Sequence, residues 1–116
     1  MNETELKSRT KQFALRVLKL VRSLGKDTSG QTTGRQLFRC ATSVGANYRA
    51  ACRARSKADF VAKLAIVEEE SDEACYWMEL IVEAELMKPN LVQPLLGEAN
   101  EIVATITSSR KSASAK

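Results

Sequence analysis

The amino-acid sequence predicts an all-α protein that forms one antiparallel four-helix bundle. A chain of 116 residues fits a single domain. Glycine (5) and proline (2) are scarce, which argues against a loop-rich or all-β chain. Apolar residues recur at three- and four-residue steps in four separate stretches, as on the buried faces of helices. The hydrophobic fraction of 44% is sufficient for a core without disulfides.

The first predicted helix covers residues 2–24. Asn2 and Glu5 have the spacing of an N-terminal cap and its reciprocal partner. One face carries the apolar residues Leu6, Phe13, Val17, Leu20, Val21 and Leu24. Leu15 and Leu18 fall outside this face. They either widen the arc that faces the core or form a contact with another subunit.

The second predicted helix covers residues 33–54 and follows a polar loop over residues 25–32. Thr33 and Gln36 match a capping box at its start. Gly45 lowers helix propensity by about 1 kcal/mol relative to Ala, which a close helix crossing would explain. Tyr48 lies on the inward face and is also a candidate for a subunit contact.

The third predicted helix covers residues 57–87, and Ser56 and Asp59 form a capping box before it. Trp77 lies beside the centre of its apolar stripe, a position that suits a seam between helices or between subunits.

Pro89 ends the third helix, and a fourth is predicted over residues 91–109 with Pro94 in its first turn. The small, basic segment 110–116 is expected to be disordered. Short connections between these helices predict up-down-up-down packing.

The composition argues against an enzyme. The chain has no histidine, which removes His-activated nucleophiles and His-ligated metals. Cys40, Cys52 and Cys75 match no zinc or redox spacing. A run of acidic residues within 68–73 is typical of a solvated helix face. We therefore predict no catalytic residue, no metal, no cofactor and no small-molecule substrate.

The sequence also indicates where the chain resides. The N-terminal residues are polar and acidic, and no apolar segment of a signal peptide follows them. No stretch reaches the roughly 18 apolar residues of a membrane span. With an odd number of cysteines and no paired motif, these features predict a cytoplasmic protein without a membrane partner.

Charge is divided unevenly along the chain. Residues 1–57 contain 13 Lys/Arg and 3 Asp/Glu, a net charge of +10. Residues 58–109 contain 2 basic and 11 acidic residues, a net charge of −9. The segment 110–116 adds three positive charges, which gives the total of +4.

Two stripes of opposite charge follow from helical spacing. The basic stripe on the second helix, which continues around the next turn, consists of Arg35, Arg39, Arg49, Arg53, Arg55 and Lys57. The acidic stripe on the third helix consists of Glu68, Asp72, Glu79 and Glu83. The stripes either pair with each other, within the bundle or between subunits, or the basic stripe faces solvent and binds nucleic-acid phosphates. Only 5% of the residues are aromatic, which leaves little for base stacking.

Three segments in a fixed order carry a family resemblance. They read QLFRCATSVGANY over residues 36–48, SKADFVAKLAI over residues 56–66 and EESDE over residues 69–73. With the fourth helix, this order resembles the four-helix-bundle proteins found in intervening sequences of bacterial 23S ribosomal RNA genes. The resemblance covers about residues 8–109.

The resemblance implies properties that composition does not. Members form antiparallel four-helix bundles and assemble as ring-shaped homopentamers. They are similar to the accessory protein of diversity-generating retroelements, a basic pentamer that works with a reverse transcriptase and its RNA. No catalytic residues belong to the family, and most members have no established role.

One departure from the family makes the second helix more basic. Many members continue after the asparagine with Ala-Glu-Gly, whereas here Asn47-Tyr48 is followed by Arg49-Ala50-Ala51. Arg39 and Asn47 match the family, with a structural role preferred for both.

Two functional hypotheses remain. The first is an oligomeric adaptor that binds RNA or a ribonucleoprotein through the basic stripe. The second is a self-assembling protein-interaction module without nucleic-acid affinity, whose contacts include Leu15, Leu18, Tyr48 and Trp77.

Overall fold

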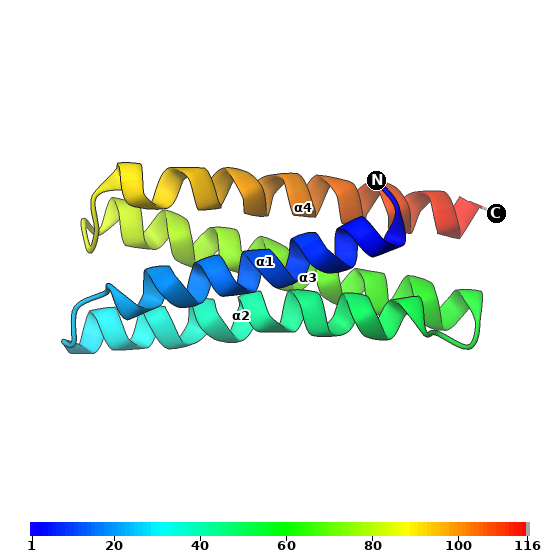
Figure 1. The fold of residues 1–116 in the computed structure, drawn as a ribbon, viewed down its shortest axis with the longest axis horizontal. Helices are drawn as coiled ribbons and strands as arrows, with labels where there is room; N and C mark the ends of the chain where they lie inside the picture. The colour runs from blue at the N-terminus through cyan, green and yellow to red at the C-terminus, as the bar shows by residue number, and fades with distance from the viewer. Residues whose placement is uncertain (116) are drawn as a thin grey trace.

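The computed structural model describes residues 1–115, and they form four long helices and no strand. The helices are α1 (Glu3–Arg22), α2 (Thr28–Cys52), α3 (Lys57–Glu83) and α4 (Pro89–Ala115). Successive helices run antiparallel along a rod of 47 × 20 × 20 Å (Figure 1). The prediction of an all-α four-helix chain is confirmed.

Helix α2 begins five residues before the predicted start. Asp27 caps it, because its Oδ1 accepts a hydrogen bond from the Gly30 amide at 3.0 Å. Thr33 does not cap the helix; its Oγ1 donates to the Ser29 carbonyl at 2.7 Å inside the first turns. The predicted eight-residue loop was therefore wrong, since most of it is helical.

Helix α3 ends at Glu83, four residues before the predicted end. Glu85 adopts the left-handed conformation with φ of 58°. The Leu86 amide donates to the Ile81 carbonyl and the Glu85 amide to the Val82 carbonyl. This pair of bonds is the Schellman arrangement that satisfies the last carbonyls of a helix.

Helix α4 is longer than predicted at both ends. Pro89 occupies its first position, where the missing N–H costs nothing, so Pro94 lies in the second turn. The prediction of a disordered tail is wrong for residues 110–115, which continue the helix. Arg110 ties this segment to α3 through a 2.6 Å hydrogen bond from Nε to Glu68 Oε1. Lys116 lies outside the described residues.

The core contains the apolar stripes of all four helices, including Phe13, Leu37 and Met78, whose side chains are fully buried. Gly45 lies where α2 crosses α1: a Cβ there would be 3.5 Å from the Thr10 carbonyl oxygen. Tyr48 is only 7% exposed and belongs to this core. Its predicted role in a subunit contact is therefore wrong, because its own bundle covers it.

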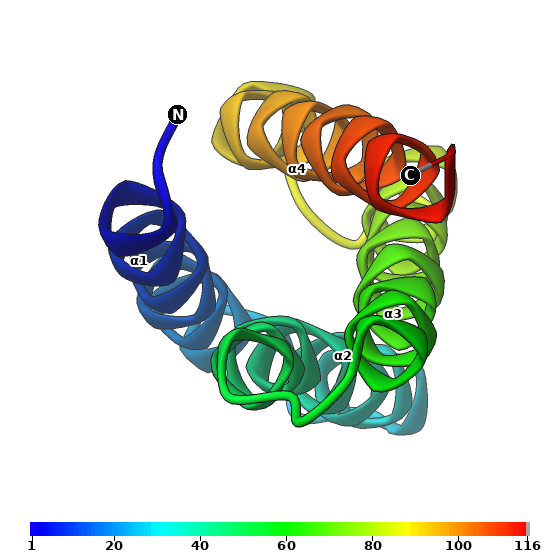
Figure 2. The ribbon, with the colours of Figure 1, turned by 90° about the vertical axis from the view of Figure 1, so that its right-hand side faces the viewer.

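The four seams between helices are unequal. Helices α2 and α3 make the most extensive contact, and α1 and α4 make the least. Viewed along the rod, α1 and α4 form the two ends of an arc that α2 and α3 complete (Figure 2). Within the described residues, no helix is both long enough and apolar enough to cross a membrane.

Candidate nucleic-acid interface

The outer face of α2, extended by its C-cap residue Arg53, carries three arginines that are exposed to solvent. Arg35 and Arg53 are 18 residues apart, which is five full turns, so both occupy the same side of the helix about 27 Å apart. Arg49 lies one turn before Arg53, and all three side chains are exposed. None of them forms an ion pair with a residue that the structure describes.

Arg39 is the exception within the stripe. Its Nη1 lies 3.1 Å from Glu70 Oε2 and its Nη2 lies 2.5 Å from Glu73 Oε2, both on α3. Hydrogen bonding to Glu73 raises the pKa of the guanidinium above its already high ordinary value. Arg39 therefore bridges α2 and α3 at the surface of the seam, in agreement with a structural role for this residue. Asn47 acts locally, because its Nδ2 donates to the Ser43 carbonyl at 2.9 Å.

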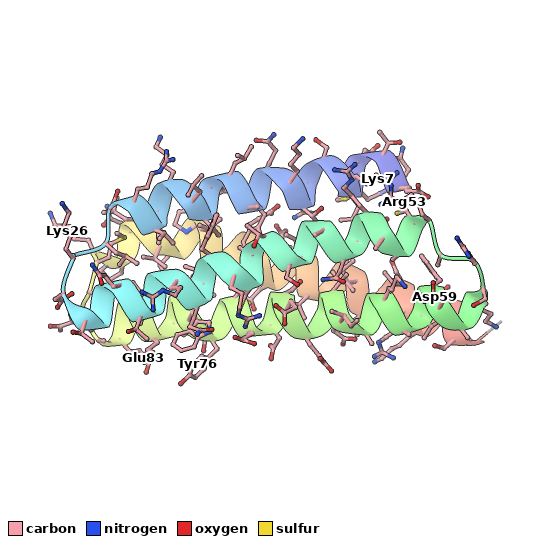
Figure 3. All side chains as sticks on the ribbon, turned by 90° about the horizontal axis from the view of Figure 1, so that it is seen from below. Lys7, Lys26, Arg53, Asp59, Tyr76 and Glu83 are labelled. Atoms are coloured by element: carbon pink, nitrogen blue, oxygen red, sulfur yellow. The ribbon has the colours of Figure 1, made fainter. Side chains whose placement is uncertain are left out.

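The last two basic residues of the predicted site lie where the chain turns from α2 into α3. Arg55 is exposed in this turn, and Lys57 is the exposed first residue of α3. The nearby Asp59 carboxylate lies 2.7 Å from Lys63 Nζ, and this contact lowers the pKa of Asp59. The turn thus adds positive charge at one end of the α2 face, beside Arg53 (Figure 3).

The acidic stripe does not meet the basic stripe. Glu68 accepts from Arg110 Nε at 2.6 Å and from Thr107 Oγ1 at 2.7 Å, and both bonds lower its pKa. Asp72, Glu79 and Glu83 are exposed and pair with no cation of the described chain.

Figure 3 shows the outer edge of α3, where Glu83 and Tyr76 project away from α2. Of the two alternatives, pairing of the two stripes inside one chain is therefore wrong. Arg39 does contact α3, but through Glu70 and Glu73, which lie outside the acidic stripe.

The predicted subunit contacts differ in exposure. Leu15 is 50% exposed and Leu18 is half-buried. Trp77 is half-buried and packs against the core, and its Nε1 donates at 3.1 Å to Glu73 Oε2, one turn earlier on the same helix. Tyr76, which packs edge-on against Trp77 with ring centroids 5.2 Å apart, is more exposed than either leucine. Sequence reasoning missed Tyr76 because it follows no apolar periodicity.

One cluster brings together groups that ligate metals elsewhere. The Cys40 thiol and the Glu70 and Glu73 carboxylates lie within 4.8 Å of one another. Arg39 already contacts both carboxylates and balances their charge. Burial raises the pKa of the Cys40 thiol to about 12. The cluster is therefore part of the contact between α2 and α3.

Comparison with known proteins places the chain in a family. The family model for 23S rRNA-intervening sequence proteins matches residues 2–108. No curated protein gives a significant match. A crystal structure from Bacteroides thetaiotaomicron, described as a protein of unknown function from the S23 ribosomal protein family, is similar, with 32% identity and a TM-score of 0.88. The match covers 96% of this chain and 99% of that one. The chain therefore belongs to the family of 23S rRNA-intervening sequence proteins.

Proposed function

We propose that this protein is a non-catalytic adaptor that binds RNA, or the RNA of a ribonucleoprotein, through the outer face of α2. The observation that carries the proposal is the set of exposed arginines at Arg35, Arg49 and Arg53, which have no anionic partner in the described chain. A row of cations of this kind neutralises phosphates and releases their counterions.

The length and shape of this face suit a nucleic-acid strand. The arginines extend over about 27 Å of helix, and Arg55 continues the charge beyond the end of α2. Glu83 of the acidic stripe lies on the edge of α3 away from α2 (Figure 3), and Glu70 and Glu73, which do face α2, are engaged by Arg39. Exposed aromatic residues are few on α2, which favours recognition of the backbone over stacking on bases.

An RNA titration over a salt series tests the proposal. We expect the logarithm of the binding constant to fall linearly with the logarithm of salt concentration. The double variant Arg49→Ala with Arg53→Ala removes two phosphate contacts, so its slope should decrease by about 1.4 for a single strand.

The matched control removes two positive charges from another surface. Lys11 and Lys19 are exposed on α1, so Lys11→Ala with Lys19→Ala has the same net charge as the arginine variant. The control should keep the original slope. Equal slopes for both variants would show that net charge alone attracts RNA, and absence of affinity at low salt would refute the proposal.

A second candidate function is self-assembly without RNA, in a ring of five copies as the family resemblance implies. The favouring observation is that Asp72, Glu79 and Glu83 have no cationic partner within the described chain, while Tyr76 and Leu15 are exposed apolar groups. In this arrangement the acidic edge of one copy meets the basic face of the next.

Light scattering distinguishes the assembly states, because one chain has a mass of 12.8 kDa and a ring of five would have five times that mass. If the ring depends on contacts between the stripes, Glu79→Lys with Glu83→Lys should dissociate it. A monomeric parent protein would eliminate this candidate.

A further inference from the structure

A small pocket lies at the turn between α1 and α2, at the opposite end of the α2 face from Arg53. Its volume is about 310 Å³, at the lower end of the range for small-ligand sites. Three cationic side chains line it: Arg22 at the end of α1, Lys26 in the turn and Arg35 on α2. Figure 3 shows Lys26 at this end of the molecule.

Glycines bring these three cations together. A Cβ on Gly30 would lie 2.2 Å from the Gly25 carbonyl oxygen, so only glycine permits the tight return of the chain. A Cβ on Gly34 would lie 3.1 Å from Val21 Cγ1, so α2 approaches the end of α1 closely there too. The cations of α1 and α2 therefore share one pocket as a result of backbone packing.

No acidic side chain is among the described residues that line this pocket, although the Asp27 carboxylate lies close to Gly25 and Gly30, which do line it. The nearest carboxylate in the sequence, Asp27, is engaged in capping α2: Oδ1 accepts from the Gly30 amide and Oδ2 accepts from the Ser29 hydroxyl, both at 3.0 Å. Arg22, Lys26 and Arg35 form no ion pair with a described residue. Three like charges around a small concave surface create a positive potential that an anion relieves.

We propose that this pocket binds a phosphate group of the RNA, and that it anchors one end of the strand bound along α2. The inference rests on the proposed RNA-binding function and adds Arg22, Lys26 and Gln31 to its site. Arg35 links the two parts, because it both lines the pocket and begins the row of exposed arginines. The uncharged Gln31, also a lining residue, supplies an amide that can donate to a phosphate oxygen.

Gln31→Glu is the most specific test of the pocket. The substitution keeps the shape of the side chain and places a negative charge among the three cations. Because Gln31 is exposed and lies near the N-terminus of α2, a carboxylate there does not weaken the helix. The matched control is Gln93→Glu, the same change at an exposed site near the start of α4.

Inorganic pyrophosphate is the first probe, titrated calorimetrically against the parent and both variants at low salt. We expect Gln31→Glu to raise the Kd at least tenfold and Gln93→Glu to change it less than twofold. Lys26→Gln with Arg22→Gln should give a similar loss. Equal affinities in all variants, or no pyrophosphate binding by the parent, would refute the proposal that the pocket binds phosphate.

RNA binding is the second readout, and it separates the two proposals. If RNA binds the parent and Gln93→Glu alike but binds Gln31→Glu at least fivefold more weakly, the pocket contributes to the strand's site. If RNA binds all three alike, the pocket proposal fails and the α2 proposal stands. If RNA binds none of them, both fail, because the phosphate assigned to the pocket belongs to RNA.

Discussion

The seam between α2 and α3 and the seam between α1 and α4 are built by different means. At the first seam, two helices joined by a short turn pack closely and bury small residues such as Cys40, Ala41 and Ala74. At the second, the first and last helices of the chain make little contact and are tied by Arg9. Its Nε and Nη2 lie 2.7 Å from the two Glu98 carboxylate oxygens, and Nη2 lies 2.9 Å from Glu101.

A groove of about 340 Å³ also lies at the α1–α4 seam. It is lined by Leu20, Leu91 and Leu95 and by two cationic side chains, Arg16 and Lys19. The comparison teaches that proximity along the chain and small side chains produce close packing. Where neither is available, a long side chain that reaches across the gap supplies the contact.

The largest effect should come from overfilling the close seam. Ala74→Leu adds buried atoms where no space is available, and it should lower the free energy of unfolding by about 1–3 kcal/mol in urea titrations. The control is Ala104→Leu on the exposed side of α4, which should change stability by less than about 0.5 kcal/mol. Equal effects of the two substitutions would mean that the seam is not close-packed.

At the looser seam, Arg9→Ala should lower the free energy of unfolding by about 1 kcal/mol. The substitution leaves Glu98, whose side chain is only 16% exposed, without its cationic partner. Lys11→Ala removes a charge from an exposed site on the same helix and serves as the control. If both variants unfold at the same urea concentration, Arg9 does not hold α1 to α4.

Acid should weaken the contact between α1 and α4. The hydrogen bond from Arg9 holds the pKa of Glu98 below its ordinary value of about 4.5. A lowered pKa in the folded chain means that this stabilisation is complete above the unfolded pKa and is lost as the pH falls through the folded pKa. Unfolding measured from pH 6 to pH 3 should therefore show falling stability below about pH 5.

Glu98→Gln should be less stable than the parent at pH 6 and should show a shallower decline with acid. Glu68 provides an internal comparison, since Arg110 and Thr107 lower its pKa in the same direction at the α3–α4 seam. A decline of unchanged steepness in Glu98→Gln would assign the acid sensitivity to other carboxylates.

The smallest effect should follow Arg39→Ala. Its side chain is 50% exposed, so solvent screens its contacts with Glu70 and Glu73. We expect a loss of stability smaller than that of Arg9→Ala in the same assay, because close packing holds α2 to α3 without this ion pair. A loss larger than that of Arg9→Ala would reverse the comparison of the two seams.

Much of the fold followed from periodicity and capping. The predicted inward face of the first helix is buried, apart from the partly buried Val21, and Asn2 and Ser56 cap α1 and α3 as their sequence patterns indicated. The start of α2 was missed because two capping patterns compete there. Asp27 prevails because it lies next to the tight turn, which leaves the helix free to begin five residues before Thr33.

Sequence reasoning predicted which helix face carries the arginines but not which residues form ion pairs with them. Helical spacing placed Arg35 and Arg53 on one face, and both are exposed in the structure, Arg35 on α2 and Arg53 at its C-cap. The partners of Arg39 depend on how α3 is rotated and shifted against α2, which no local pattern specifies. The pocket beside Arg22 and Lys26 was missed for a similar reason, since it exists only because glycines let two helices meet closely.

Four antiparallel helices place the beginning of α1 and the end of α4 at the same end of the rod (Figure 1). The pocket lined by Lys26 lies at the other end, whereas Arg53 lies beside Lys7, near the start of α1 (Figure 3). A fluorescent tag or surface tether attached at either terminus would therefore leave the pocket clear but would crowd the Arg53 end of the α2 face. For surface-immobilised measurements, internal labelling in the exposed middle of α4, for example at Ala104, avoids this geometric bias.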